Sequence, residues 1–351
     1  MSKPTFEQTL REELVTFFRM DRFTMQPLTG GASARRYFLL EFHGPIYFPE
    51  SRVALMVIPP DDTAMFDNYV YLDYYLKRQR VPTPSVFEVH RERGWIFVHY
   101  QEQPTIEEYL KAYPGAMERV LTGQIDFLVD LQRRCRPEFS CPAFQRRFDV
   151  AKYQFEFRFH LEEQLLRFYY EEEPERNLLD PFAARISEGL DVDRPIFVHR
   201  DFQSSNLFVC NGENAPQFWL IDFQDARHGN PVYDLVSCLW DSYLPVPDAL
   251  RRTLMERFFP TLAELGIDWS WAEFERQVDW MVIQRKLHDA GAFAYNFRRI
   301  GSPRFLAFLP GAVHMALTVM DRYPEFHPFA EWLSRLDPPP HHLPDGSHAR
   351  K

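Results

Sequence analysis

Hydrophobic positions follow a helical period at the start of the chain and an extended pattern directly afterwards. Over residues 5–18 the apolar side chains fall on one helical face, and Thr5 with Gln8 fits a capping box. The segment 28–40 predicts a strand, a glycine-containing turn and a second strand. The apolar run 53–58 is stopped by two prolines and predicts a short buried strand.

The alternation of helical and extended patterns continues to about residue 100. Residues 62–79 carry a helical apolar stripe, and 86–89 with 95–100 predict a hairpin around 91–94. The first hundred residues are therefore expected to contain about five strands and two helices.

From residue 105 the pattern becomes mainly helical. Residues 106–111 and 117–134 have a helical period. Residues 148–169 fit both an alternating strand and a helical stripe, and their length favours the helix.

Short strands return in the middle of the chain before the helices resume. Residues 196–198 predict a strand, and 207–210 with 218–221 predict a hairpin across the Asn-Gly pair at 211–212. Helices are expected over 232–335.

These elements predict an α+β chain with two lobes and a tail. We expect a small β-rich lobe at 1–101, a larger and mainly helical lobe at 102–336, and a flexible tail, rich in Pro and His, at 337–351. A length of 351 residues agrees with about two domains.

Composition narrows the classes of partner. Acidic residues outnumber basic ones by 50 to 40, so the chain lacks the basic field that attracts nucleic acid, and no nucleic-acid partner is expected. Four cysteines without a C-x-x-C pair predict reduced thiols and a cytoplasmic location. Without a signal-peptide pattern or an uninterrupted apolar run of membrane-spanning length, no membrane partner is expected. No obligate protein partner is evident.

One constellation carries chemistry, and two common phosphate-binding motifs are missing. The chain has no G-x-x-x-x-G-K-[ST] and no G-x-G-x-x-G. It does have H-R-D-x-x-x-x-N at 199–206, followed by Leu-Ile-Asp-Phe at 220–223. Asp201 would accept a proton from a hydroxyl nucleophile, while Asn206 and Asp222 would hold a divalent metal that bridges phosphates. This spacing predicts phosphoryl transfer from ATP with Mg²⁺.

Around this motif the chain resembles the kinase-like phosphotransferases, which include aminoglycoside phosphotransferases, choline kinases and homoserine kinases. Within them, the segments at 30–38, 221–226, 231–237 and 284–294 are similar to those of bacterial N-acetylmuramate/N-acetylglucosamine anomeric kinases of cell-wall recycling. The resemblance runs from about residue 8 to 335. It implies a two-lobed protein-kinase-like fold and an amino-sugar acceptor.

The resemblance also implies roles for individual residues. The turn with Gly30, Gly31 and Ser33 would cover the ATP phosphates, and Tyr100 and Glu102 would lie near the adenine. On the acceptor side, the candidates are Asp225, Glu156 and Arg285.

The resemblance implies a structural role for Asp234, and the motif itself indicates one for His199. Asp234 is expected to brace the catalytic loop, and His199 is expected to be structural.

One departure from kinases concerns the phosphate-anchoring lysine. Met56 stands where kinases usually place this Lys, and a thioether cannot neutralise phosphate charge. The anomeric-kinase branch also has Met at this position. We expect Arg35 or Arg36, which follow the glycine turn, to supply the missing charge. Gly31 and Ala34 also depart from the branch, which carries Asp and an aromatic residue there.

Two alternatives remain at this point. A cationic acceptor, such as an aminoglycoside or choline, would need an acidic rim, for which Glu162, Glu163 and 171–173 are candidates. A pseudokinase that only binds ligands is the other alternative, motivated by Met56. The intact Asp201, Asn206 and Asp222 argue against it.

Overall fold

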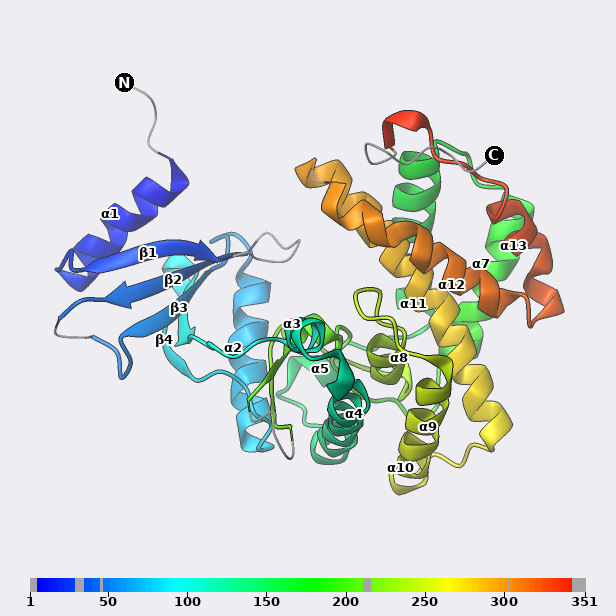
Figure 1. The fold of residues 1–351 in the computed structure, drawn as a ribbon, viewed down its shortest axis with the longest axis horizontal. Coiled ribbons are helices and arrows are strands. Elements are labelled where there is room, and N and C mark those ends of the chain that lie inside the picture. Colours follow the sequence, from blue (N-terminus) through cyan, green and yellow to red (C-terminus); the bar gives the residue numbers. More distant parts are fainter. Residues whose placement is uncertain (1–4, 29–34, 45–46, 211–215, 302, 343–351) are drawn as a thin grey trace. The chain divides into compact units, whose positions relative to one another are not determined.

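A computed structural model describes residues 5–28, 35–44, 47–210, 216–301 and 303–342 (Figure 1). The chain forms two compact units. The first contains Met1–Gln103 and Trp219–Gln224, and the second contains Pro104–Phe218 and Asp225–Lys351.

The first unit is built on a five-stranded antiparallel sheet with the order β1-β2-β3-β5-β4. Its strands are β1 (Phe23–Leu28), β2 (Arg36–Phe42), β3 (Arg52–Val57), β4 (Val86–His90) and β5 (Trp95–His99). Its helices are α1 (Phe6–Phe18), α2 (Thr63–Arg78) and the short turn η1 (Arg91–Arg93) within the β4–β5 hairpin. This arrangement confirms the predicted five strands and two main helices.

Aromatic side chains fill the core between α1 and the sheet. Phe18 on α1 lies within 6 Å, centroid to centroid, of the rings of Phe23, Phe42 and Phe97 on three strands. The predicted capping box at Thr5 is present and fixes the start of α1. The abundance of Phe therefore serves packing in this unit.

The second unit is mainly helical. Its α-helices within the described residues are α3 (Ile106–Ala112), α4 (Met117–Arg134), α5 (Pro142–Gln145), α6 (Val150–Glu156), α7 (Arg176–Leu190), α8 (Tyr233–Leu239), α9 (Asp248–Phe258), α10 (Pro260–Glu264), α11 (Trp271–Ile300), α12 (Leu309–Met320) and α13 (His327–Leu333). Short helical turns are η2 (Pro114–Ala116), η4 (Ser204–Asn206), η5 (Pro303–Phe308), η6 (Pro324–Phe326) and η7 (Pro340–His342). The 30-residue helix α11 is the central element, and α12 packs along it.

Short strands flank the H-R-D-x-x-x-x-N segment. β6 (Ile196–Val198) pairs antiparallel with β9 (Arg227–Gly229), and β7 (Leu207–Val209) pairs with β8 (Phe218–Leu220). The strand at 196–198 and the hairpin strands are confirmed, whereas the predicted turn at 211–212 lies outside the described residues. The sequence did not predict β9, because its three residues show no apolar alternation.

The ambiguous segment near residue 150 is helical, as its length indicated. It begins as α6 and continues from Phe157 as the π-helical segment η3 (Phe157–Tyr170). Gly291 of α11 faces this segment closely, since a Cβ there would lie 2.0 Å from the carbonyl oxygen of His160. Only glycine therefore permits α11 and η3 to approach this closely.

One described segment, Pro303–Met320, meets the length and hydropathy criteria for a membrane span, with a mean hydropathy of 1.3. Its α12 part buries side chains such as Leu309 and Met320, and core helices of globular units meet the same criteria. Beyond α13, His342 is buried, and its ring faces the carbonyl oxygen of Tyr169 at 2.8 Å. This contact differs from the expected flexible tail, whose residues 343–351 lie outside the described residues.

Candidate active site

A buried carboxylate organises the loop that carries Asp201. Asp234 of α8 accepts backbone N–H bonds from His199 at 2.7 Å and from Arg200 at 2.9 Å, so it braces the loop as expected. Arg200 has a φ of +81°, a left-handed conformation that is costly for a residue with a Cβ. The two hydrogen bonds hold this conformation and fix the direction of the loop just before Asp201.

Asp241 is a second buried brace, which the sequence did not reveal. It accepts N–H bonds from Ser204 at 2.7 Å and from Tyr243 at 2.8 Å. Asn206 then donates from Nδ2 to the backbone oxygen of Asp201 at 2.8 Å. This bond uses the amide nitrogen, which leaves the amide oxygen as the atom suited to a cation.

Arg285 of α11 contacts the predicted catalytic base directly. Its Nη2 donates to Oδ1 of Asp201 at 2.8 Å, and its Nε lies 3.4 Å from Asp289. Burial raises the pKa of Asp201, but the charges of Arg285 and Arg200 more than offset this, so that the pKa lies below its ordinary value. Asp201 is therefore a carboxylate at neutral pH and able to accept a proton or a hydrogen bond.

A chain of polar groups links Arg285 to Glu156. Arg285 Nη1 lies 3.2 Å from Nδ1 of His288, whose Nε2 lies 3.0 Å from Oε2 of Glu156. The same Oε2 lies 3.2 Å from Nε2 of His160, and Oε1 lies 2.5 Å from Nζ of Lys152. The structure thus brings the two predicted acceptor-side residues, Glu156 and Arg285, into one connected cluster.

The protonation of this cluster follows from its burial and charges. Burial raises the pKa of Glu156, but His288, His160 and Arg200 lower it well below its ordinary value. Burial lowers the pKa of His160 to about 4, and the charge of His288 adds to this effect. Glu156 is therefore ionised and His160 neutral at neutral pH.

Sequence reasoning missed most members of this cluster. Lys152, Glu156 and His160 are spaced by four residues, a signal that places them on one helical face. His288 and Asp289 follow Arg285 within one turn of α11. That α6 and α11 face each other through these residues depends on tertiary packing, which the spacing does not show.

In the first unit, Asp222 is held by Arg35. Arg35 Nη2 donates to Oδ1 of Asp222 at 2.5 Å, and Nε2 of Gln224 donates to the same oxygen at 2.9 Å. Asp222 has a φ of +66°, a left-handed conformation. Burial raises the pKa of the neighbouring Tyr37 to about 12, partly opposed by Arg35.

The two arginines that follow the glycine turn lie in different environments. Arg36 is exposed, and its guanidinium lies over the Phe6 ring, 4.1 Å from the centroid. Met56, at the position of the expected lysine, is buried in β3 opposite Tyr37. Within the part of the chain that the structure describes, Arg35 contacts a predicted site residue, Asp222, whereas Arg36 contacts Phe6.

Arg52 contacts two of the predicted nucleotide-binding residues. Glu102 forms an ion pair with Arg52, whose guanidinium also lies 4.8 Å from the centroid of the Tyr100 ring. Gly30, Gly31 and Ser33 lie outside the described residues.

Asp225 and the metal candidates fall in both units. Asp225 belongs to the second unit, is about half exposed, and lies 4.0 Å from Arg146. Asp201 and Asn206 also belong to the second unit, whereas Asp222 belongs to the first. Their predicted convergence on one Mg²⁺ stays a prediction.

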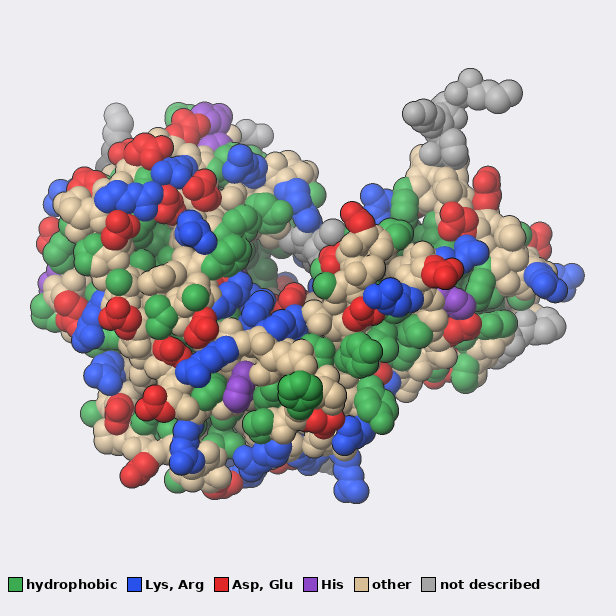
Figure 2. Space-filling model, turned by 180° about the vertical axis from the view of Figure 1, so that it is seen from behind, with side chains coloured by type: hydrophobic (Ala, Val, Ile, Leu, Met, Phe, Trp, Pro, Cys, Tyr) green, Lys and Arg blue, Asp and Glu red, His purple; other side chains and the backbone are tan. Residues whose placement is uncertain are grey.

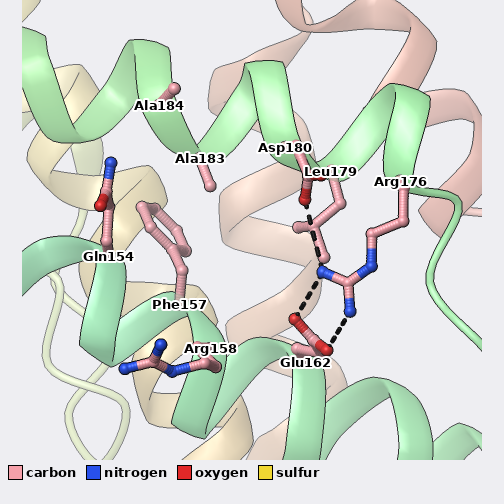
Figure 3. A pocket seen from close by; sticks show the side chains of 9 residues that line it. All are labelled: Gln154, Phe157, Arg158, Glu162, Arg176, Leu179, Asp180, Ala183 and Ala184. Atoms are coloured by element: carbon pink, nitrogen blue, oxygen red, sulfur yellow. Dashed lines mark hydrogen bonds and ion pairs between the residues drawn. The ribbon is translucent and has the colours of Figure 1, made fainter.

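A separate pocket of about 260 Å³ lies between α6 with η3 and α7 (Figure 3). Arg176 pairs with Glu162 inside it, and Phe157 and Leu179 supply apolar walls. Glu162, an acidic-rim candidate, lines this pocket, whereas none of the described residues predicted for catalysis, metal or nucleotide binding does. Over the face of the molecule in Figure 2, charges of both signs are interspersed, in agreement with the absence of a general basic field.

The β-rich unit, the helical unit and the braced H-R-D-x-x-x-x-N loop together define a protein-kinase-like small-molecule phosphotransferase. Residues 24–273 match the model of the phosphotransferase enzyme family (APH), and the chain belongs to this family.

Curated relatives cover nearly the whole chain. The N-acetylmuramate/N-acetylglucosamine kinase of Neisseria meningitidis is 27% identical over 93% of this chain and 95% of its own length. The kinase of the same name from Pseudomonas putida is 26% identical over 93% of this chain and 94% of its own length.

Solved structures share the fold at low identity. Choline kinase LicA from Streptococcus pneumoniae superposes with a TM-score of 0.62 at 12% identity, covering 90% of this chain and 100% of that chain. The gentamicin complex of the aminoglycoside phosphotransferase APH(2")-IIa gives 0.57 at 16% identity, covering 90% and 97%.

Proposed function

We propose that this phosphotransferase transfers the γ-phosphoryl group of ATP to the anomeric hydroxyl of an N-acetylated amino sugar, N-acetylmuramate or N-acetylglucosamine, in cell-wall recycling. The observation that carries the proposal is the ionised Asp201, held 2.8 Å from buried Arg285 on a loop braced by Asp234. The two relatives that are called N-acetylmuramate/N-acetylglucosamine kinases and match nearly the full chain support the choice of sugar. Because the reaction uses ATP, we place it in the cytoplasm.

In this proposal Asp201 is the base that receives the hydroxyl proton. An anomeric hydroxyl is more acidic than an ordinary alcohol, so a carboxylate with a lowered pKa suffices. Arg285 keeps Asp201 ionised and fixes its direction. Glu156 is nearly inaccessible, with a side chain 1% exposed, so we propose that it orders Lys152 and His288 instead of touching the sugar. Asp225, which is half exposed, remains an acceptor-side candidate.

The metal and nucleotide residues fit the same proposal. The amide oxygen of Asn206 and the carboxylate of Asp222 are the hard oxygen donors that Mg²⁺ prefers, and Mg²⁺ held there would neutralise charge on the phosphates. Arg35 would supply the positive charge that Met56 lacks. The backbone around Gly30, Gly31 and Ser33 would cover the phosphates, with Tyr100 and Glu102 beside the adenine.

The alternative with a cationic acceptor is not favoured by the described contacts. Glu162 pairs with Arg176 and Arg167, and Arg167 also pairs with Glu163 and Glu173. Three of the five carboxylates expected to form an acidic rim, Glu162, Glu163 and Glu173, are therefore engaged with arginine.

The test is phosphorus NMR with mass spectrometry on mixtures of the protein, ATP, Mg²⁺ and a panel of sugars, aminoglycosides and choline. A sugar 1-phosphate is expected, and it should disappear when EDTA removes the metal. Asp201→Asn should lower kcat by about 10²- to 10⁴-fold without lowering Tm. Product from choline or an aminoglycoside, with none from any amino sugar, would refute the proposal.

A further inference from the structure

Four basic side chains from separate segments gather in the second unit, beside the catalytic loop. We call them the cationic cluster: Arg146 in the loop before α6, Lys152 in α6, Arg200 in the catalytic loop and Arg227 in β9. None of them is fully exposed. Arg200 directly precedes Asp201 and lies 3.6 Å from Glu156, so the cluster adjoins both the predicted base and a predicted acceptor-side residue.

Nearby carboxylates only partly balance the cationic cluster. Lys152 and Arg200 share one oxygen of Glu156, at 2.5 and 3.6 Å. Arg146 lies 4.0 Å from Asp225 and donates to the carbonyl oxygen of Ala226 at 2.9 Å. The buried Nε of Arg227 has no hydrogen-bond partner within the described part of the chain. Arg200 also feels the charge of Asp201, so four positive groups face three carboxylates, and a further anion would be stabilised here.

The pKa shifts of the four cations differ. Burial lowers the pKa of Arg200, but Glu156 and other nearby groups more than offset this and raise it above its ordinary value. Burial lowers the pKa of Arg146, Lys152 and Arg227, and the positive charge of Arg200 lowers each of them further. Mutual repulsion in a partly buried place is relieved when an anion binds between the cations.

A metal is a poorer occupant of this region. Glu156, His160 and His288 bring three ligand atoms within 4.8 Å of one another, which resembles a metal-binding set. However, Lys152 and Arg200 lie against the same carboxylate and would repel a cation.

We propose that the cationic cluster binds a carboxylate substituent of the acceptor, so that the enzyme prefers acidic amino sugars to neutral ones. This inference rests on the proposed function and adds a specificity site to it. Guanidinium and ammonium groups are the usual partners of carboxylates, and hydrogen bonds between charged groups are the stronger ones.

The experiment compares kcat/KM for N-acetylmuramate, which carries a carboxylate, with that for N-acetylglucosamine, which lacks it. The wild type should prefer the acid. Lys152→Gln and Arg227→Gln should each reduce this preference about tenfold, as expected for one lost charged hydrogen bond, and leave the KM for ATP unchanged. Lys152→Arg should restore most of the preference.

Arg158→Gln is the matched control, since Arg158 is an exposed cation further along the same helix, beside the pocket of Figure 3. It should retain the wild-type preference, and Tm values should show that all variants fold. An equal loss for both sugars, a raised KM for ATP, or a wild type that does not distinguish the sugars would overturn the inference while the proposed function stands. The absence of any sugar phosphate would refute both.

Discussion

Arg35 and Asp222 lie 187 positions apart in the sequence, and their side chains meet at 2.5 Å. Arg35 precedes β2, and Asp222 follows β8 in the segment that returns to the first unit. The arginine side chain is only 8% exposed, so the ion pair is held by its surroundings. In a chain with Met56 on the neighbouring strand, this pair puts a positive charge beside the predicted metal ligand.

Replacing Arg35 by Met should therefore weaken nucleotide use. If Arg35 contacts the phosphates as proposed, its loss is expected to raise the KM for ATP about tenfold or more and to lower kcat, because charged hydrogen bonds are among the stronger ones. Steady-state kinetics with varied ATP at saturating acceptor measures both constants.

Arg36→Met is the control for this prediction. Arg36 carries the same charge one residue away but is exposed and lies over the Phe6 ring. Its replacement should change the KM for ATP less than twofold or so, as expected for a surface substitution. The assignment to Arg35 fails if Arg36→Met has the larger effect.

The contact of Arg35 with Asp222 could not be predicted from the sequence. Periodicity and turn residues predicted the five strands, α1, α2 and the helical character near residue 150, because these features depend on neighbours in the sequence. Whether Arg35 or Arg36 faces the site depends on which side chain points inward at the start of β2. The sequence before β2 gives no local signal for this choice.

The chain of polar groups from Arg285 through His288 to Glu156 was only partly predictable for a similar reason. Glu156 and Arg285 were found through a family resemblance, whereas His288, which joins them, carries no motif of its own. Asp241 is similar, since it acts on Ser204 from 37 positions away. Such groups become visible only when α6, α8 and α11 have packed together.

Arg285→Gln should impair both catalysis and stability. Without the guanidinium, Asp201 loses its 2.8 Å partner, while Asp289 keeps Lys286 at 2.6 Å. The Asp201 side chain is 29% exposed, so the loss should be smaller than the roughly 3–5 kcal/mol expected for a fully buried carboxylate. We expect kcat to fall at least about tenfold and the free energy of unfolding to fall measurably. Kinetics and urea denaturation test the two effects separately.

Arg276→Gln on the same helix is the control for Arg285. Arg276 is about half exposed and only 3.9 Å from Glu273, so its ion pair should contribute about 1 kcal/mol or less. If Arg285→Gln behaves like Arg276→Gln, Arg285 does not support Asp201.

Stability should fall in mildly acidic solution because of His160. Its folded pKa is about 4, below the ordinary 6.5, so between these values the unfolded chain binds a proton that the folded chain excludes. The free energy of unfolding is therefore unaffected by the titration of His160 above pH 6.5. It falls by up to about 3 kcal/mol as the pH falls toward 4. The lowered pKa of Glu156 acts in the same direction at its lower pH.

Urea denaturation between pH 4 and 7 measures this dependence. His160→Gln should flatten the slope between pH 6.5 and 4, whereas His314→Gln, at an exposed position of α12, should leave it unchanged. Equal slopes for wild type and His160→Gln would show that the imidazole is not kept neutral by burial.

Gly291→Ala tests the close approach of α11 and η3. The new Cβ would lie 2.0 Å from the backbone oxygen of His160, so the two helices must separate, at a cost of about 1–3 kcal/mol or more. Because His160 and His288 lie across this contact, with ring centroids 4.0 Å apart, the separation should also raise the KM for the acceptor.

Gly311→Ala in α12 is the matched control, since nothing lies within 4 Å of its Cβ and alanine favours helix by up to about 1 kcal/mol. A Gly291→Ala variant as stable as Gly311→Ala would show that α11 and η3 do not pack as described.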